Sequence, residues 1–219
     1  ALLEKIASHP DLYTFAILTN GSLIDETKAQ WLAKLKPRYI QVSMDGDKTI
    51  HDSIRGEGNF EKTCEAIRLL KANNIRVMVS FTASKLNYLS FPSVAETCRK
   101  LNADFLWSDR LIPDKNLDHN FIQVGQESPN AMLMTKIETH RFFSLMQIEA
   151  DLCRADPSTI TRVKMHRALQ FQYSDTTPYR CVAGETLITI MPNGDMYPCR
   201  RMPVKVGNVM QTPMAALYF

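Results

Sequence analysis

The feature that most constrains this chain is an alternation of short apolar runs of β type with helix-like stretches, from the first residues to about Pro113. Its four apolar runs are Tyr13–Thr19, Arg38–Met44, Ile75–Thr82 and Ala103–Trp107. Alternation of this kind is typical of parallel strands joined by right-handed helical crossovers, so it predicts an α/β fold. The continuous apolar character of the runs further predicts strands that are buried on both faces.

Capping signals predict three helices between these strands. They run from Asp25 to Leu35, from Asn59 to Ala72 and from Phe91 to Leu101. Periodicity does not separate an open doubly wound sheet from a barrel, because both place each strand between neighbours and cover it with helices. The choice between these architectures therefore depends on motifs.

Beyond Pro113 the alternation stops and two further regions follow, residues 114–178 and residues 179–219. In the first of them a polar stretch leads into a long helix with an apolar stripe that is expected to pack in the core. The stripe consists of Met134, Ile137, Leu145, Ile148 and Leu152. A second helix is predicted to start at Asp156–Pro157 and to run to about Phe171.

The last region contains a hairpin signal. Two short extended runs, Leu187–Met191 and Asp195–Cys199, flank an Asn193–Gly194 pair. An Asn-Gly pair between such runs favours a tight turn between antiparallel strands. Thr212–Pro213 then offers a helix start.

Composition excludes several classes of protein. The 219 residues are 45% hydrophobic and 22% charged, as in a globular chain with a core. The net charge is only +3 and the basic residues are dispersed, so neither a nucleic-acid partner nor a membrane partner is expected. The apolar runs are far shorter than the roughly 20 residues that span a bilayer, and no signal peptide is recognisable. We therefore expect a cytoplasmic location.

The five cysteines are too few and too odd in number for a secreted disulfide framework, so reduced thiols or metal ligands are expected. Cys64, Cys98 and Cys153 each lie in a helical pattern among apolar residues. Buried structural thiols are the expected interpretation of these three.

Polar residues follow each predicted strand, at the end where parallel α/β proteins bind ligands. Taken alone, Asn20-Gly21 and Asp45-Gly46 can be simple turns, since both pairs supply turn-forming residues. The stretch after the second strand adds an arginine, Arg55, that can fork onto a carboxylate. The candidate residues at these strand ends are Asn20, Ser43, Asp45, Arg55, Thr82 and Arg110.

Four motifs in this order resemble those of radical S-adenosylmethionine (SAM) enzymes that carry a SPASM or twitch auxiliary iron–sulfur domain. They are Thr19-Asn20-Gly21, Ser43-x-Asp45-Gly46, His51-Asp52-x-x-Arg55-Gly56 and Gly194-Asp195-x-Tyr197-Pro198-Cys199. The resemblance implies a partial (β/α)6 barrel over residues 1–113, a helical connecting region over 114–178, and the start of a SPASM/twitch domain over 179–219. In these enzymes a reduced [4Fe–4S] cluster passes an electron to SAM, and the resulting 5′-deoxyadenosyl radical abstracts a substrate hydrogen.

The resemblance also implies roles for individual residues, although it assigns no catalytic residue. Ser43 and Arg55 would hold the methionyl carboxylate of SAM, and Asp45 would support that loop. Thr82 and Arg110 would line the adenosine and substrate side, and Asn20 would face the same cavity.

Cys181 and Cys199 would bind the first auxiliary [4Fe–4S] cluster. The hairpin is expected to carry Cys199 back alongside Ile188, toward the loop that holds Cys181, so that two thiolates face one cluster. Two unrelated cysteines, or a disulfide with its α-carbons within about 7 Å, are the alternatives.

One departure from the family pattern is that these residues contain no Cys-x-x-x-Cys-x-x-Cys loop. The run Tyr13–Thr19 matches the family's third strand, so we expect the loop and two strands upstream, further auxiliary-cluster cysteines downstream, and an apolar edge at this run. The ligands of the SAM-cleaving cluster would then lie outside this chain, and the fragment alone would be inactive. A cluster-free relative is the alternative.

The function that the resemblance implies is radical modification of a peptide or protein side chain, with an electron donor such as a flavodoxin or ferredoxin. The runner-up is a degenerate, non-catalytic barrel that binds a peptide or protein partner without cleaving SAM. An unrelated phosphate-binding barrel is disfavoured, because it would need a glycine-rich loop at a helix start.

Overall fold

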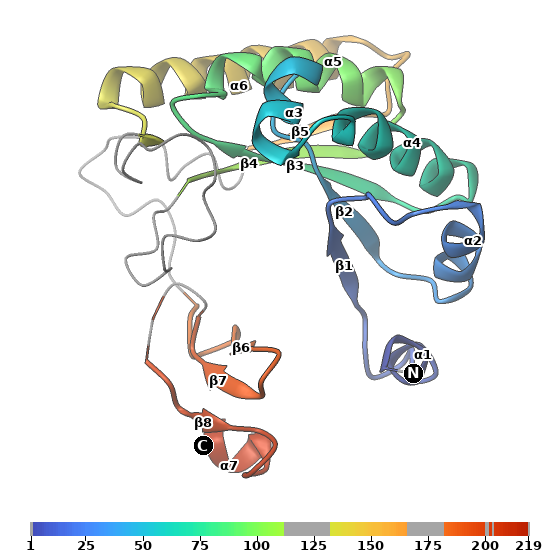
Figure 1. Ribbon diagram of the computed structural model, residues 1–219, viewed down its shortest axis with the longest axis vertical. Helices are drawn as coiled ribbons and strands as arrows, with labels where there is room; N and C mark the ends of the chain where they lie inside the picture. Colours follow the sequence, from blue (N-terminus) through green and yellow to red (C-terminus); the bar gives the residue numbers. More distant parts are fainter. Residues whose placement is uncertain (1, 112–131, 166–181, 200–201, 203, 219) are drawn as a thin grey trace. The chain divides into compact units, whose positions relative to one another are not determined.

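The computed structural model describes residues 2–111, 132–165, 182–199, 202 and 204–218 (Figure 1). The chain divides into two compact units. One comprises residues 1–113 and 117–173, and the other comprises residues 114–116 and 174–219. Each unit is described by itself.

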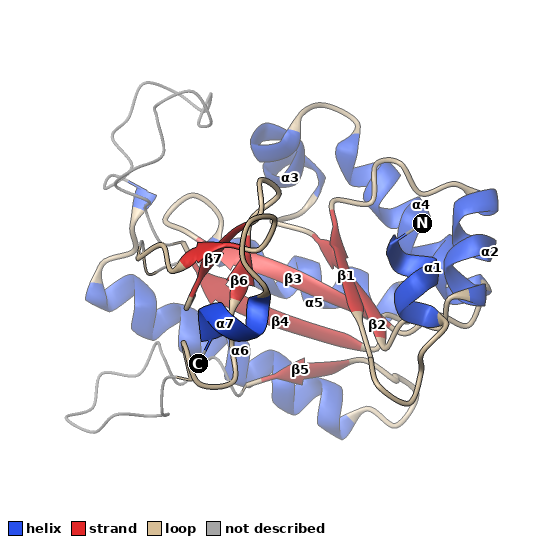
Figure 2. Cartoon of the chain, turned by 90° about the horizontal axis from the view of Figure 1, so that it is seen from below, coloured by secondary structure: helices blue, strands red, loops and turns tan. Residues whose placement is uncertain are grey.

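The first unit is built on a five-stranded parallel sheet whose strands follow one another in chain order (Figure 2). The strands are β1 (Ala16–Thr19), β2 (Tyr39–Ser43), β3 (Val77–Ala83), β4 (Phe105–Arg110) and β5 (Arg162–Lys164). Parallel pairing joins each strand to the next, for example with Val42 opposite Val79. The α/β class and the parallel order of the first four strands, both predicted from the sequence, are confirmed.

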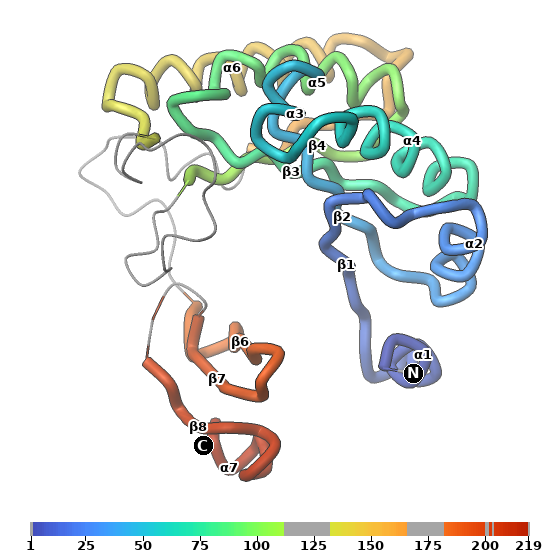
Figure 3. The backbone as a smooth tube through the Cα atoms, in the orientation of Figure 1, coloured from blue at the N-terminus to red at the C-terminus, as the bar shows by residue number. Residues whose placement is uncertain are grey.

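Helices connect these strands, and Figure 3 follows the chain from each strand through its helix to the next. They are α2 (Glu26–Lys34), α3 (Lys48–Arg55), α4 (Asn59–Ala72), the short 3-10 helix η1 (Tyr88–Ser90), α5 (Phe91–Lys100) and α6 (Lys136–Ala155), whereas α1 (Leu2–Ala7) precedes β1. Asp25 caps α2, because its carboxylate accepts a hydrogen bond from the Lys28 backbone N–H at 2.7 Å. The three helices predicted from capping signals are confirmed as α2, α4 and α5.

The core of the first unit lies between the sheet and the helices. Figure 1 shows α3, α4, α5 and α6 on the same face of the sheet. Phe81 of β3, Phe91 of α5 and Phe142 of α6 are fully buried there, and their ring centroids lie 5.4 to 5.9 Å apart. This aromatic contact fixes two helices against the third strand.

The opposite face of the sheet is not covered by these helices. Along β3, Val77, Val79 and Phe81 point into the core, so Met78 and Thr82 point the other way, and Thr82 is exposed. At the edge strand β1, Leu18 is 68% exposed, which matches the expected apolar edge. The prediction that the strands are buried on both faces is confirmed for β2, where Ile40, Gln41 and Val42 are all buried, but it is wrong for β1 and for part of β3. Apolar runs signal burial only where elements cover both sides of a sheet.

The helix predicted from Asp156 is wrong over the described residues, where β5 forms instead. The β-branched residues around it favour an extended chain. Thr161 Oγ1 donates to the Ala103 carbonyl at 2.7 Å, and the Arg162 N–H donates to the Asp104 carbonyl at 3.0 Å. The edge of β4 thus supplies partners that a helix would lack. Residues 166–171 of the predicted helix lie outside the described residues.

Helix α6 is present as predicted, but most residues of the apolar stripe that was expected to pack in the core are exposed. Ile148 is 54% exposed and Leu152 is 50% exposed, and Ile137 is more exposed still. The buried residues of α6 are Thr139, Phe142, Met146, Glu149, Ala150 and Cys153. Glu149 is tolerated on the buried face because Arg99 of α5 donates to its carboxylate at 2.7 Å.

The second unit contains a small antiparallel sheet of β6 (Thr189–Ile190), β7 (Asp195–Tyr197) and β8 (Gly207–Asn208), followed by α7 (Met214–Tyr218). The predicted turn at Asn193–Gly194 is confirmed, and Gly194 has a φ of 86° that favours glycine. Thr189 lies opposite Tyr197, so the register places Pro198, not Cys199, level with Ile188. Within the described ranges, no helix has the length and apolar character needed to cross a membrane.

Candidate functional site

Helix α3 follows the carboxyl end of β2 and carries two residues that bond to Asp45. The sequence analysis did not predict this helix. Asp47 caps its start by accepting a hydrogen bond from the Ile50 N–H at 3.1 Å, and Gly56 ends it with a φ of 98°. An acidic cap and a glycine on either side of eight residues are signals that could have predicted this helix. His51 and Arg55 lie four positions apart, so they share one face of the helix.

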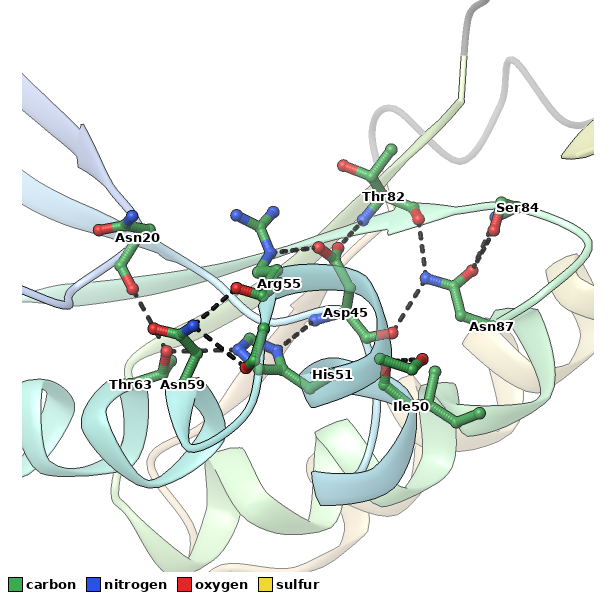
Figure 4. A network of polar contacts seen from close by, with 12 residues as sticks. Asn20, Asp45, Ile50, His51, Arg55, Asn59, Thr63, Thr82, Ser84 and Asn87 are labelled. Carbon is green, nitrogen blue, oxygen red and sulfur yellow. Dashed lines mark hydrogen bonds and ion pairs between the residues drawn. The ribbon is translucent and has the colours of Figure 1, made fainter. Parts of the chain in front are cut away.

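Asp45 is the centre of the polar network at this edge, and all of its polar groups are bonded (Figure 4). Its side chain is only 4% exposed. Oδ2 accepts from Arg55 Nε at 2.6 Å, and Oδ1 accepts from the Thr82 N–H at 3.0 Å. The Asp45 N–H donates to His51 Nδ1 at 3.1 Å, and its carbonyl accepts from Asn87 Nδ2 at 3.0 Å. The residue is therefore held from α3, from β3 and from the segment before η1.

The His51 side chain is fully buried, and it lies next to the loop that holds Asp45. Burial lowers the pKa of His51, and the neighbouring Arg55 charge lowers it further, while Asp45 and Asp52 act in the opposite direction. Because Nδ1 accepts the Asp45 N–H, that nitrogen carries no proton, and the ring is neutral in this arrangement. The ring packs edge-on against Phe60, with centroids 5.9 Å apart.

Arg55 uses only part of its guanidinium for the ion pair with Asp45. The contact is made by Nε, and the side chain remains 30% exposed. In Figure 4 the two terminal nitrogens point away from Asp45 and from α3. The Arg55 carbonyl accepts from Asn59 Nδ2 at 2.6 Å, which anchors the last turn of the helix. A two-nitrogen edge is thus held in a fixed orientation at the rim.

Asp52 points to a different partner, the start of α4. Its carboxylate accepts the N–H groups of Phe60 at 2.7 Å and Gly58 at 3.0 Å. These backbone hydrogen bonds, that of Phe60 above all, lower the pKa of Asp52. In the His51-Asp52-x-x-Arg55-Gly56 motif, His51 and Arg55 therefore bond to Asp45, whereas Asp52 fixes the start of α4.

Glycine is required at two of the motif positions. A Cβ on Gly46 would lie 2.6 Å from Ile50 Cβ, because the loop passes close to α3. Gly21 has a φ of 82°, and a Cβ there would lie 3.1 Å from Ala66 Cβ on α4. Close packing of the loops on helices explains why glycine follows both Asp45 and Asn20.

The remaining candidate residues occupy neighbouring strand ends. Ser43 ends β2 opposite Ser80, two positions before Asp45. The Asn20 carbonyl accepts from Thr63 Oγ1 at 3.2 Å, and its side chain accepts from Ser22. Arg110 ends β4 opposite Ala83, and its N–H donates to Asp109 Oδ1. The structure thus joins Asp45, Arg55 and Thr82 directly, sets Ser43 and Asn20 at adjacent ends, and leaves Arg110 one strand farther along the sheet.

The cysteines fall into two groups. Cys64, Cys98 and Cys153 are buried in helices, as expected, and burial raises the pKa of the Cys64 thiol to about 11. Cys199 is partly buried, and its backbone forms a bridge with Met202. Cys181 lies outside the described residues, so the pairing of Cys181 with Cys199 stays a prediction. Among the residues that are described, no three His, Cys, Asp or Glu side chains gather as a metal site.

This geometry defines a class: a parallel α/β protein with a fixed arginine at the carboxyl ends of its strands, followed by a small antiparallel unit. Family profiles give the particular family. The radical SAM superfamily profile matches residues 1–101, and the SPASM profile, an iron–sulfur cluster-binding domain, matches residues 181–218. The chain thus matches both domains of the radical SAM enzymes that carry a SPASM domain, which confirms the resemblance seen in its motifs.

Relatives agree with this assignment. The antilisterial bacteriocin subtilosin biosynthesis protein AlbA of Bacillus subtilis is 26% identical over 93% of this chain and 42% of its own length. An AdoMet-dependent heme synthase of Methanosarcina barkeri is 25% identical over 92% of this chain and 59% of its own length. The chain therefore spans about half the length of these curated relatives.

A solved structure shows the same fold. Streptococcus suis SuiB bound to S-adenosylmethionine superposes with a TM-score of 0.70 and 15% sequence identity. The match covers 100% of this chain and 51% of that chain. SuiB has also been crystallised bound to the precursor peptide SuiA.

Proposed function

We propose that this chain forms the SAM-binding side of a radical SAM enzyme that modifies a peptide or protein side chain. The observation that carries this proposal is the orientation of Arg55. Its Nε is occupied by Asp45, and its terminal nitrogens remain at the rim of the sheet, in the arrangement that binds a carboxylate through two parallel hydrogen bonds.

The residues at this edge fit the methionyl carboxylate of SAM. Arg55 supplies charge and two donors, and Ser43 at the end of β2 supplies a hydroxyl. Asp45 orients the arginine and keeps its charge partly neutralised before the ligand binds. We place Asn20, Thr82 and Arg110 around the rest of the cofactor and the substrate. Reductive cleavage of SAM at a [4Fe–4S] cluster supplies the radical chemistry.

Two iron–sulfur sites belong to the proposal. Because the 219 residues contain no three-cysteine loop, the ligands of the SAM-cleaving cluster are proposed to lie outside them. Cys181 and Cys199 are proposed ligands of the auxiliary cluster, since the SPASM profile begins at Cys181 and includes Cys199. A flavodoxin or ferredoxin in the cytoplasm is the proposed electron donor, because the chemistry needs a low-potential reductant.

The peptide substrate is supported by the relatives. AlbA takes part in the biosynthesis of a bacteriocin, and SuiB binds a precursor peptide. The heme synthase among the relatives favours a second candidate, a porphyrin substrate. Both candidates share the SAM site, so only a substrate assay separates them.

The test uses the full-length protein with its clusters reconstituted under anaerobic conditions. We expect 5′-deoxyadenosine on reduction with SAM, and a mass change in a short peptide encoded beside its gene. Modification of an iron porphyrin without modification of any peptide would support the second candidate. Tight peptide binding with no 5′-deoxyadenosine would instead identify a non-catalytic barrel and contradict the proposal.

Substitution of Arg55 tests the SAM site itself. Arg55→Ala is expected to weaken SAM binding by about 2 to 3 kcal/mol, the loss of a charge-assisted hydrogen-bonding group. Arg68→Ala is the matched control, because Arg68 is an exposed arginine of α4 that pairs with Glu65 at 3.0 Å. Isothermal titration of SAM into both variants is the measurement. Unchanged SAM affinity in Arg55→Ala would contradict the assignment of this site.

A further inference from the structure

Asn87 is a buried polar residue that no motif of the sequence analysis includes. It lies immediately before η1 and is 2% exposed. Its Nδ2 donates to the carbonyls of Asp45 and Thr82, both at 3.0 Å. Its Oδ1 accepts from the Ser84 N–H at 2.8 Å and from Ser84 Oγ at 3.0 Å. The side-chain amide therefore has a partner for both its donors and its acceptor (Figure 4).

The partners of Asn87 determine which residue types suit the position. Two carbonyls require donors on one side, and an N–H and a hydroxyl require an acceptor on the other. A side-chain amide of this length meets both demands, whereas a carboxylate would place an oxygen against the two carbonyls. A buried carbonyl that loses its donor costs about 1 to 3 kcal/mol.

The donors of Asn87 are not needed to shape the turn in which it lies. That turn is closed by backbone bonds, with the N–H groups of Asn87 and Tyr88 donating to the Ser84 carbonyl at 3.3 and 3.1 Å. The Nδ2 group instead reaches 42 positions back along the chain to the Asp45 carbonyl. Asn87 thus ties the end of β3 to the loop after β2.

We propose that Asn87 is a positioning residue for the SAM carboxylate site, acting through Asp45 on Arg55. This inference rests on the proposed function. Asn87 holds the Asp45 carbonyl while the Thr82 N–H holds one carboxylate oxygen, so the other oxygen is fixed 2.6 Å from Arg55 Nε. When the Asp45 carbonyl loses this anchor, the carboxylate shifts and the arginine edge loses its fixed orientation. The expected consequence is weaker SAM binding without a change in any group that contacts SAM.

The experiment is a double-mutant cycle on the full-length, cluster-reconstituted enzyme. Asn87→Asp keeps the acceptor for Ser84 and removes both donors. It is expected to weaken SAM binding about 10-fold, as for the loss of a buried hydrogen bond to a neutral group. In the Arg55→Ala background the same change is expected to alter SAM affinity less than about 2-fold, because coupled residues are not additive. The KM for SAM should rise while kcat stays close to that of the parent enzyme.

Controls separate this role from a purely structural one. Ser84→Ala removes the Ser84 hydroxyl that donates to Asn87 Oδ1 and leaves the donors to Asp45 in place, so SAM affinity should be unchanged. Asn87→Ala carries the same expectation as Asn87→Asp if the aspartate variant fails to fold. Equal losses in the parent enzyme and in the Arg55→Ala background, or unchanged affinity in both Asn87 variants, overturn the inference while leaving the proposed function intact. If Arg55→Ala itself binds SAM normally, the proposed site fails.

Discussion

Replacing Asp45 by Asn tests how much the ion pair with Arg55 contributes to the stability of the first unit. The substitution preserves an oxygen for the Thr82 N–H but turns an amide N–H₂ toward Arg55 Nε, a donor against a donor. Breaking a fully buried pair costs about 3 to 5 kcal/mol. Because Arg55 is 30% exposed and water can replace part of the lost contact, we expect about 2 kcal/mol here.

Urea denaturation monitored by circular dichroism measures this loss. For a unit of this size, 2 kcal/mol corresponds to a fall in Tm of roughly 4 to 8 °C. The matched control is Glu65→Gln, which breaks an exposed carboxylate–arginine pair with Arg68 and should cost less than about 0.5 kcal/mol. Equal losses of stability in the two variants would refute the reasoning, because the burial of Asp45 would then add nothing to the free energy of its ion pair.

Two further predictions concern the core. The pKa of His51 is below its ordinary value, so as the pH falls below about 6.5 the unfolded chain takes up a proton first and stability is lost. His51→Asn keeps an acceptor for the Asp45 N–H and should flatten that part of the curve in urea titrations from pH 7.5 to 5; an unchanged slope contradicts it. On α6, Phe142→Ala should cost about 3 to 5 kcal/mol and Ile148→Ala less than about 0.5 kcal/mol, measured by thermal unfolding. Similar losses would mean that the buried face is misassigned.

The parts of the fold that could be predicted from the sequence are those whose signal is local. Strands β1 to β4 are dense runs of β-branched and aromatic residues, and α2, α4 and α5 have capping signals. Strand β5 is three residues long and exists because the edge of β4 offers partners, which no local pattern records. The face of α6 was ambiguous because Ile148 and Phe142 lie on different sides of a helix that is apolar on both.

The site was predictable to a different extent. The ordered motifs marked Ser43, Asp45 and Arg55 as residues near the same edge, because carboxyl ends of parallel strands meet there. They could not show that Asp45 binds Arg55 through Nε, since this depends on the turn of α3. Asn87 was missed because its partner, Asp45, lies 42 positions away, and a lone asparagine before a turn has a local explanation that conceals the distant one.

The choice of arginine at position 55 fits both the Asp45 contact in the structure and the carboxylate contact proposed for its terminal nitrogens. A lysine has one ammonium group, which Asp45 would engage, and the rim would then present no separate edge to an anionic ligand. Arginine gives Nε to Asp45 at 2.6 Å and keeps two terminal nitrogens in the same plane for a second carboxylate. Because Asp45 is itself bonded by His51, Thr82 and Asn87, the guanidinium is oriented before a ligand arrives. The conformational entropy of the Arg55 side chain is then lost when the protein folds, so ordering this side chain does not weaken ligand binding.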